Sequence, residues 1–125
     1  MKFKIMIVDD DTDLVQILTS ALEATGYEVQ SAPEPVAGLR LSRQFHPDLI
    51  ILDYHMPGTS GAHLFESFRR NQSTAKTPIL FMSGQASQEQ IESEIADDKH
   101  IRFLPKPAHI NDLRDTIRGM LPTPK

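Results

Sequence analysis

The sequence predicts a doubly wound α/β fold, in which helices cover both faces of a parallel β-sheet. Short apolar segments alternate strictly with longer segments whose apolar residues recur at helical spacing. The short segments are apolar throughout, which is typical of parallel strands buried on both faces. A chain of 125 residues is long enough for one such domain. The predicted strands cover residues 4–8, 29–32, 48–53, 78–83 and 101–104.

The segments between the strands predict five helices joined to the strands by right-handed crossovers. The apolar face of the first helix is expected at Leu14, Ile17, Leu18, Ala21 and Leu22. Gly26 is well placed to cap that helix at its C-terminal end. The second, third and fifth helices are expected around residues 36–45, 64–68 and 110–120. Residues 88–97 carry few apolar anchors, so we expect the fourth helix to dock loosely.

Composition and charge exclude several classes of function. A formal net charge of −4 without any basic run argues against direct nucleic-acid binding. The absence of cysteine excludes disulfides, thiolate metal sites and cysteine nucleophiles. The first apolar run stops at Asp9, too early for a signal peptide, and no other run approaches the ~20 residues of a membrane span. We therefore expect a cytoplasmic protein.

Polar residues follow the predicted strands at the edge where functional groups collect in such sheets. Asp9 and Asp10 follow the first strand, and Asp53 ends the third. Ser83 ends the fourth strand, and Lys106 stands between two prolines after the fifth. Carboxylates at this density raise one another's pKa, and a hard divalent cation such as Mg²⁺ relieves the conflict. The sequence thus predicts an acidic metal site beside a hydroxyl and an ammonium group.

Simpler interpretations exist for each residue alone. Asp11 and Asp13 are accounted for as the cap and first turn of a helix. Asp53 could end a strand at a turn, Ser83 could cap the next helix, and Lys106 could be a solvated surface lysine. The joint occurrence of these residues at successive strand ends favours a shared site.

These residues resemble a known family. The set Val8-Asp9-Asp10, Leu52-Asp53 with Met56-Pro57 and Gly61, Ser83-Gly84 and Lys106-Pro107 is similar to that of receiver domains of two-component response regulators. The resemblance runs from the first strand to the last helix. It departs from the family pattern at Ser83, where threonine is more usual, at Gly84, where alanine is more usual, and at residues 97–100, which lack a common glycine turn.

The resemblance implies a flavodoxin-like sheet of strand order 2-1-3-4-5 and a phosphoryl group accepted by Asp53. It implies that Asp10 binds Mg²⁺ directly, Asp9 binds it through water, and the backbone carbonyl of His55 is a further ligand. Ser83 and Lys106 would hold phosphoryl oxygens. Phe103 would be the aromatic switch residue, acting by packing because it lacks a hydroxyl. The Lys106–Pro107 bond would be cis.

The resemblance also implies partners and boundaries. The phosphoryl group would come from a histidine kinase or a histidine phosphotransfer protein. The signal would leave through the face of the fourth helix, fifth strand and fifth helix, toward a downstream protein or an output domain, and that face is also a candidate homodimer surface. Residues 1–121 would form the receiver domain and residues 122–125 a tail or the start of a linker. Such a domain is a signalling phosphoacceptor, which catalyses only its own phosphorylation and dephosphorylation.

Two alternatives remain. Phosphatases of the haloacid dehalogenase type also use an aspartate nucleophile with Mg²⁺, and Asp9 and Asp11 fit their acidic motif. Asp13 does not fit it, because that place takes a small hydroxyl or apolar residue. The second alternative is a docking module of the same fold that is never phosphorylated.

Overall fold

Strands and helices alternate along the chain as the apolar pattern predicts, except for a short hairpin of two strands after the third strand, which the sequence did not predict. The structure is a computed structural model, and it describes residues 2–56, 58–84, 88–95 and 98–122. The strands are β1 (Lys4–Val8), β2 (Glu28–Ala32), β3 (Leu49–Asp53), β4 (His55–Met56), β5 (Thr59–Ser60), β6 (Ile79–Ser83) and β7 (Ile101–Pro105). The helices are α1 (Thr12–Ala24), α2 (Pro35–Phe45), α3 (Gly61–Arg70), α4 (Gln88–Glu94) and α5 (Ile110–Met120).

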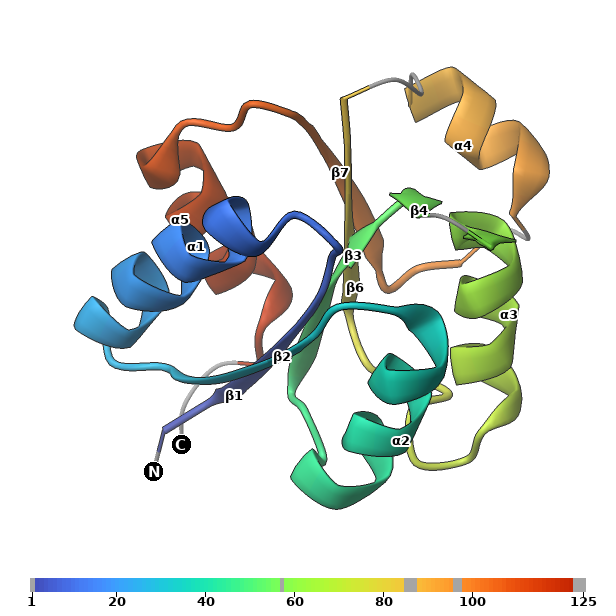
Figure 1. Ribbon diagram of the computed structural model, residues 1–125, viewed down its shortest axis with the longest axis horizontal. Coiled ribbons are helices and arrows are strands. Elements are labelled where there is room, and N and C mark those ends of the chain that lie inside the picture. Colours follow the sequence, from blue (N-terminus) through green and yellow to red (C-terminus); the bar gives the residue numbers. More distant parts are fainter. Residues whose placement is uncertain (1, 57, 85–87, 96–97, 123–125) are drawn as a thin grey trace.

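A five-stranded parallel sheet runs through the centre of the molecule in the order β2-β1-β3-β6-β7. Helices α1 and α5 cover one face of the sheet, and α2, α3 and α4 cover the other (Figure 1). The short hairpin of β4 and β5 lies outside this sheet. When only the five strands of the sheet are numbered along the chain, their order is the predicted 2-1-3-4-5. The predicted flavodoxin-like fold is confirmed. Since all five strands run in one direction, their carboxyl ends meet at one rim of the sheet.

The sheet separates two apolar cores. Alternate strand residues point to opposite faces, so Met6 and Val8 lie in the core under α2, α3 and α4, while Ile5 and Ile7 lie in the core under α1 and α5. All five residues of β3 and of β6 are buried. This double burial is the physical reason that the central strands read as unbroken apolar runs.

The ends of α1 follow from local sequence. Asp11 is the N-cap, and its side chain accepts a hydrogen bond from the Leu14 N–H at 3.1 Å. At the other end Gly26 has φ +105°, its N–H donates to Glu23 O, and Tyr27 N–H donates to Leu22 O. These two bonds form a Schellman motif, which confirms Gly26 as the predicted cap. The expectation for Ile17 was wrong, because its side chain is 65% exposed.

The second half of the molecule adds detail to the prediction. Helix α4 ends at Glu94; Ile91 within it and Ile95 just after it are buried. The other expected residues of that helix, 96 and 97, lie outside the described residues. Pro105 is the last residue of β7, an edge strand, where a missing N–H is tolerated. Within the described ranges, no helix combines the length and apolar character needed to cross a membrane.

Candidate functional site

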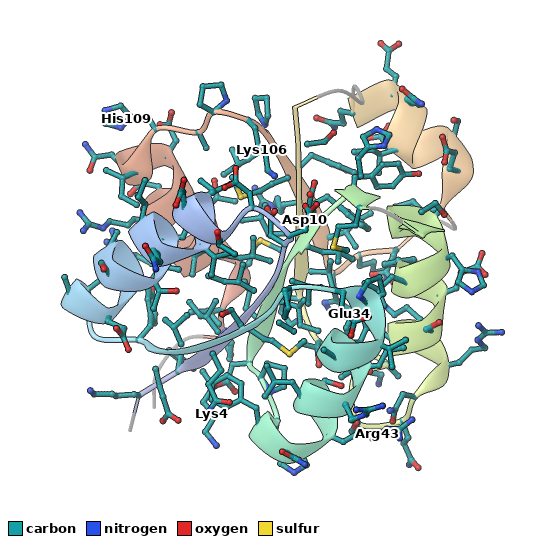
Figure 2. The ribbon with its side chains drawn as sticks, in the orientation of Figure 1. Lys4, Asp10, Glu34, Arg43, Lys106 and His109 are labelled. Atoms are coloured by element: carbon teal, nitrogen blue, oxygen red, sulfur yellow. The ribbon has the colours of Figure 1, made fainter. Side chains whose placement is uncertain are left out.

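The rim of the sheet collects side chains from four strands. Asp9 follows β1, Asp53 ends β3, Ser83 ends β6 and Lys106 follows β7. These strands are neighbours in the sheet, so their final residues come together although the sequence separates them by up to 97 positions. Figure 2 shows Asp10 and Lys106 on the same side of the molecule, at this rim. The predicted juxtaposition is confirmed.

Three carboxylates form the acidic part of the site. Asp9, Asp10 and Asp53 each offer an oxygen, and these oxygens lie within 4.8 Å of one another. Asp9 and Asp53 are buried, with 4% and 5% of their surface exposed, whereas Asp10 is exposed. Backbone N–H groups orient the buried pair, because Asp11 N–H donates to Asp9 Oδ1 at 2.9 Å and His55 N–H donates to Asp53 Oδ1 at 3.2 Å.

Lys106 supplies the cation of the site. Its Nζ lies 2.8 Å from Asp9 Oδ2 and 3.4 Å from Asp53 Oδ1. The backbone holds Lys106 in place, since its N–H donates to Ser83 O at 2.9 Å. The Lys106–Pro107 bond is cis, as the resemblance implied. Burial on its own would lower the pKa of Lys106, but the Asp9 hydrogen bond and the charges of Asp53 and Asp9 outweigh burial and raise this pKa. The ammonium group therefore stays protonated at neutral pH.

One ammonium does not balance three carboxylates. Burial raises the pKa of Asp53 above its usual value, and the charge of Asp9 raises it further. The Lys106 charge and the His55 N–H act in the opposite direction but do not outweigh these two effects. The ionised site thus has an excess of negative charge in a partly desolvated place. A set of carboxylate oxygens with this charge fits a hard divalent cation such as Mg²⁺.

Ser83 and Phe103 border the site on the β6–β7 side. Ser83 is buried and pairs with Pro105 across the two strands. Phe103 is half-buried and stacks on Phe81, with ring centroids 5.8 Å apart and an interplanar angle of 17°. A cavity of about 230 Å³ has both Ser83 and Phe103 in its lining, together with Ile91 of α4. The two predicted switch residues therefore share one space, which also reaches α4.

The sequence did not predict the role of Tyr54, which directly follows Asp53. Its side chain is buried, and its hydroxyl donates a hydrogen bond to Glu94 at the end of α4. Burial raises the pKa of Tyr54 far above its ordinary value, and the hydrogen bond to Glu94 and its charge add to this effect. The phenol is therefore a donor. No signal in the sequence pairs residues 54 and 94, because their contact depends on how α4 docks.

Histidine metal ligation, by contrast, finds no support. The chain has five histidines, at positions 46, 55, 63, 100 and 109. All of them are exposed, as predicted. The only group of metal-binding side chains among the described residues is the aspartate cluster.

Comparison with known proteins decides the family. The model of the response regulator receiver domain matches residues 5–118. The chain belongs to this family. The matched range contains the three aspartates, Ser83 and Lys106, and it reaches from β1 into α5. The match favours the receiver domain over the haloacid dehalogenase phosphatase and the docking module that the sequence left open.

Similar curated proteins are response regulators. The chain is 32% identical over 124 residues to the DNA-binding dual master transcriptional regulator RpaA of a Synechocystis species, covering 94% of this chain and 48% of that protein. It is 33% identical over 120 residues to the phosphate regulon transcriptional regulatory protein PhoB of Pseudomonas aeruginosa, covering 94% of this chain and 51% of that protein. The receiver domain thus spans about half the length of these two relatives.

Similar solved structures include one that the alignment covers over its full length. The chemotaxis protein CheY4 of Vibrio cholerae superposes with a TM-score of 0.85 at 27% sequence identity. The alignment covers 97% of this chain and all of that chain. The receiver domain of the hybrid histidine kinase CckA superposes with a TM-score of 0.78 at 28% identity, covering 95% of this chain and 99% of that one.

Proposed function

We propose that Asp53 of this receiver domain accepts a phosphoryl group from a phosphorylated histidine of a histidine kinase or a histidine phosphotransfer protein. The observation that carries the proposal is the environment of the Asp53 carboxylate. It ends the central strand β3, lies in the acidic cluster with Asp9 and Asp10, and has the Lys106 ammonium 3.4 Å away. A residue that merely ended a strand would have no need of this surrounding.

The chemistry follows from the charges of these side chains. A carboxylate oxygen of Asp53 forms a bond to phosphorus while the bond from phosphorus to the donor imidazole nitrogen breaks, and the imidazole keeps that electron pair. The protonated Lys106 and the Ser83 hydroxyl are suited to hold the equatorial oxygens of the transferring group. Holding Lys106 between Asp9 and Asp53 fixes the cation before the phosphoryl group arrives.

The residues of the cluster also fit a Mg²⁺ cofactor. Asp10 and Asp53 would be direct ligands with the His55 backbone carbonyl, and Asp9 would act through a water molecule. Bound Mg²⁺ would neutralise the carboxylates and stabilise the negative charge of the phosphoryl oxygens. The excess of carboxylates over ammonium groups supports this assignment, since Lys106 alone leaves the pKa of Asp53 raised.

The cavity that Ser83 and Phe103 both line would transmit phosphorylation to the surface of the domain. A Ser83 hydroxyl drawn toward a phosphoryl oxygen would change the space beside the Phe103 ring, and Phe103 would respond by packing alone. The altered surface would be that of α4, β7 and α5, which would control a partner protein or an attached output domain, or form a homodimer. Residues 1–121 would make up the receiver domain and residues 122–125 a tail or linker.

The test is stoichiometric labelling with a small acyl phosphate and Mg²⁺, followed by intact mass measurement. We expect one phosphoryl group on the wild-type chain and none on Asp53→Asn. Asp13→Asn is the matched control, because Asp13 is an exposed aspartate in the first turn of α1, and it should be labelled like the wild type. Labelling of Asp53→Asn to the wild-type extent would refute the proposal, and sustained turnover of an external phosphate ester would support a phosphatase instead.

A further inference from the structure

Residues of α2 and α3 line a groove. Both helices lie on the sheet face opposite to α1 and α5 (Figure 1). It consists of two cavities of about 350 Å³ and 540 Å³. Leu39 of α2 and Ser67 of α3 line both cavities, so the two form one continuous depression. None of the proposed phosphorylation residues lines this groove. It is also separate from α4, β7 and α5.

One end of the groove is apolar. Pro35, Val36 and Leu39 line it from α2, and Leu64 lines it from α3. The remaining lining residues are Gly58, His63, Ser67 and Glu34, whose carboxylate caps α2 by accepting a hydrogen bond from the Ala37 N–H. Val36 is 56% exposed and is one of only two large hydrophobic side chains in the described part of the chain with such exposure. An exposed aliphatic side chain on the wall of a hollow gains most when a partner side chain buries it.

The other end of the groove is basic. Arg43 and Arg70 stand in the last turns of α2 and α3, and both line the second cavity. Both are exposed, and in the ranges that the structure describes neither has an ion pair or a hydrogen bond to another side chain. Figure 2 shows Arg43 near the end of α2 that lies away from Glu34.

The helix dipole favours arginine in a last turn and accounts for each arginine taken alone. Because α2 and α3 run in the same direction, their last turns lie at the same end of the groove, and the dipole brings both arginines there. It leaves these two guanidinium groups without an acidic partner among the described residues, in a chain of net charge −4. Two unpaired guanidinium groups lining one cavity repel each other, and a carboxylate placed between them relieves this repulsion through charge-assisted hydrogen bonds.

The spacing between the lining residues along the groove indicates the shape of the ligand. Val36 and Arg43 are seven residues apart on α2, and His63 and Arg70 are seven residues apart on α3. Seven helical residues span about 10 Å. A helix lying along the groove would therefore place an apolar side chain at one end and a carboxylate two turns away.

We propose that the α2–α3 groove binds an amphipathic acidic helix of a partner protein. Apolar side chains of that helix would contact Val36 and Leu39, and its carboxylates would pair with Arg43 and Arg70. This is helix-in-groove recognition, in which ion pairs at one end of the groove fix the position of the bound helix. It goes beyond phosphotransfer and gives the receiver domain a second contact surface. The apolar half of the groove makes a helix a better fit than a nucleic acid, whose phosphates would use only the arginines.

The test uses two labelled helical peptides and fluorescence anisotropy with the full chain. Each peptide carries leucines at positions i and i+4 and glutamates at i+7 and i+11, and the second peptide has the reversed order, because the helix direction is open. We expect the wild type to bind one peptide, and Arg43→Ala with Arg70→Ala to weaken that binding about three- to tenfold. Arg40→Ala is the matched control, since Arg40 is exposed on the same helix but lines neither cavity, and it should bind like the wild type.

Charge reversal sharpens the result. The double variant Arg43→Glu and Arg70→Glu should lose the glutamate peptide and gain a peptide with lysines at the same positions. Absence of binding to the wild type at millimolar peptide in both directions would overturn the proposal, and so would equal binding by the Arg43→Ala, Arg70→Ala variant. Binding of a DNA duplex or of anionic vesicles that depends on these arginines, without peptide binding, would overturn it in favour of a phosphate ligand.

Discussion

Lys106 partly neutralises the carboxylates at the rim of the sheet. Its ammonium lies between two buried carboxylates from different strands, at 2.8 Å and 3.4 Å. The pKa of Lys106 is raised and that of Asp53 is raised too, which means that the lysine gains from the arrangement while the aspartate remains short of positive charge. A divalent cation would therefore act on a site that Lys106 has only partly neutralised.

Replacement of Lys106 makes this argument testable. We expect Lys106→Ala in a chelating buffer to lower the free energy of unfolding by about 2 kcal/mol, because two buried carboxylates lose their cation. Mg²⁺ should raise the melting temperature of the wild type and should raise that of the variant by more, because a ligand of the native state stabilises it by mass action. Urea unfolding measures the free energy of unfolding, and differential scanning fluorimetry measures the melting temperatures.

Lys99→Ala is the control for this experiment, because Lys99 is exposed and has no ion pair among the described residues. It should leave both quantities at their wild-type values. A melting temperature that stays constant up to millimolar Mg²⁺ in the wild type and in Lys106→Ala alike would contradict the metal assignment.

At the scale of elements, a close backbone approach fixes the start of α3. Gly61 N–H donates to Tyr54 O at 2.9 Å, and a Cβ on Gly61 would lie 2.5 Å from the Tyr54 ring and 2.8 Å from its Cα. Gly119 in α5 has nothing within 4 Å of such a Cβ. We expect Gly61→Ala to destabilise the protein by about 2 kcal/mol through this clash. Gly119→Ala should stabilise it by about 0.5–1 kcal/mol through helix propensity.

Denaturant unfolding of the two glycine variants checks this pair. The two substitutions are chemically identical, so opposite signs isolate the packing at Gly61 from the propensity effect. Equal effects of the two alanines would mean that Tyr54 moves aside easily, and the close approach would then not fix the start of α3.

The hydroxyl of Tyr54, the residue after Asp53, donates a hydrogen bond to Glu94, the last residue of α4. Ile91 within α4 and Ile95 just after it pack into the core, and the Tyr54–Glu94 bond adds a polar contact to this apolar attachment. We expect Tyr54→Phe to speed amide exchange in α4 several-fold, which corresponds to about 1 kcal/mol for the lost bond. Glu94→Gln keeps an acceptor and should have a smaller effect. Unchanged exchange in Tyr54→Phe would show that packing alone holds α4.

Across the whole molecule, the sequence predicted the buried parallel strands and the residues at their ends. It did not predict contacts that depend on how the helices dock. The strands could be predicted because β3 and β6 are buried on both faces, and the site could be predicted because Asp53 and Lys106 stand directly after strands. Ile17 was misplaced because helical spacing defines an apolar stripe but not how far a neighbouring element covers its edge. The Tyr54–Glu94 bond depends on the docking of α4, which local sequence does not determine.

The same limit applies to the ion pair that ties three distant segments together. Arg69 of α3 donates through Nε to Asp98 Oδ2 at 2.8 Å and through Nη1 to the carbonyls of Thr74 and Thr77 at 2.9 Å and 2.7 Å. Burial on its own would raise the pKa of Asp98, but the Arg69 hydrogen bond, the His100 N–H and the charge of Arg69 outweigh burial and lower this pKa. Asp98 thus links α3 to the segment before β7.

A lowered pKa in the folded state gives this pair a defined pH dependence. The stability that Asp98 contributes is present above its unfolded pKa, near 3.8, and is lost as the pH falls through the lower folded pKa. We expect Asp98→Asn to be less stable than the wild type by about 1–2 kcal/mol near neutral pH, with the difference shrinking below about pH 4. Asp115→Asn removes an exposed ion pair with Arg118 at 3.8 Å and should change stability little at any pH. Urea unfolding at a series of pH values measures these differences. If the stability advantage of the wild type over Asp98→Asn stayed constant from about pH 7 to about pH 3, Arg69 would not lower the pKa of Asp98 in the folded state.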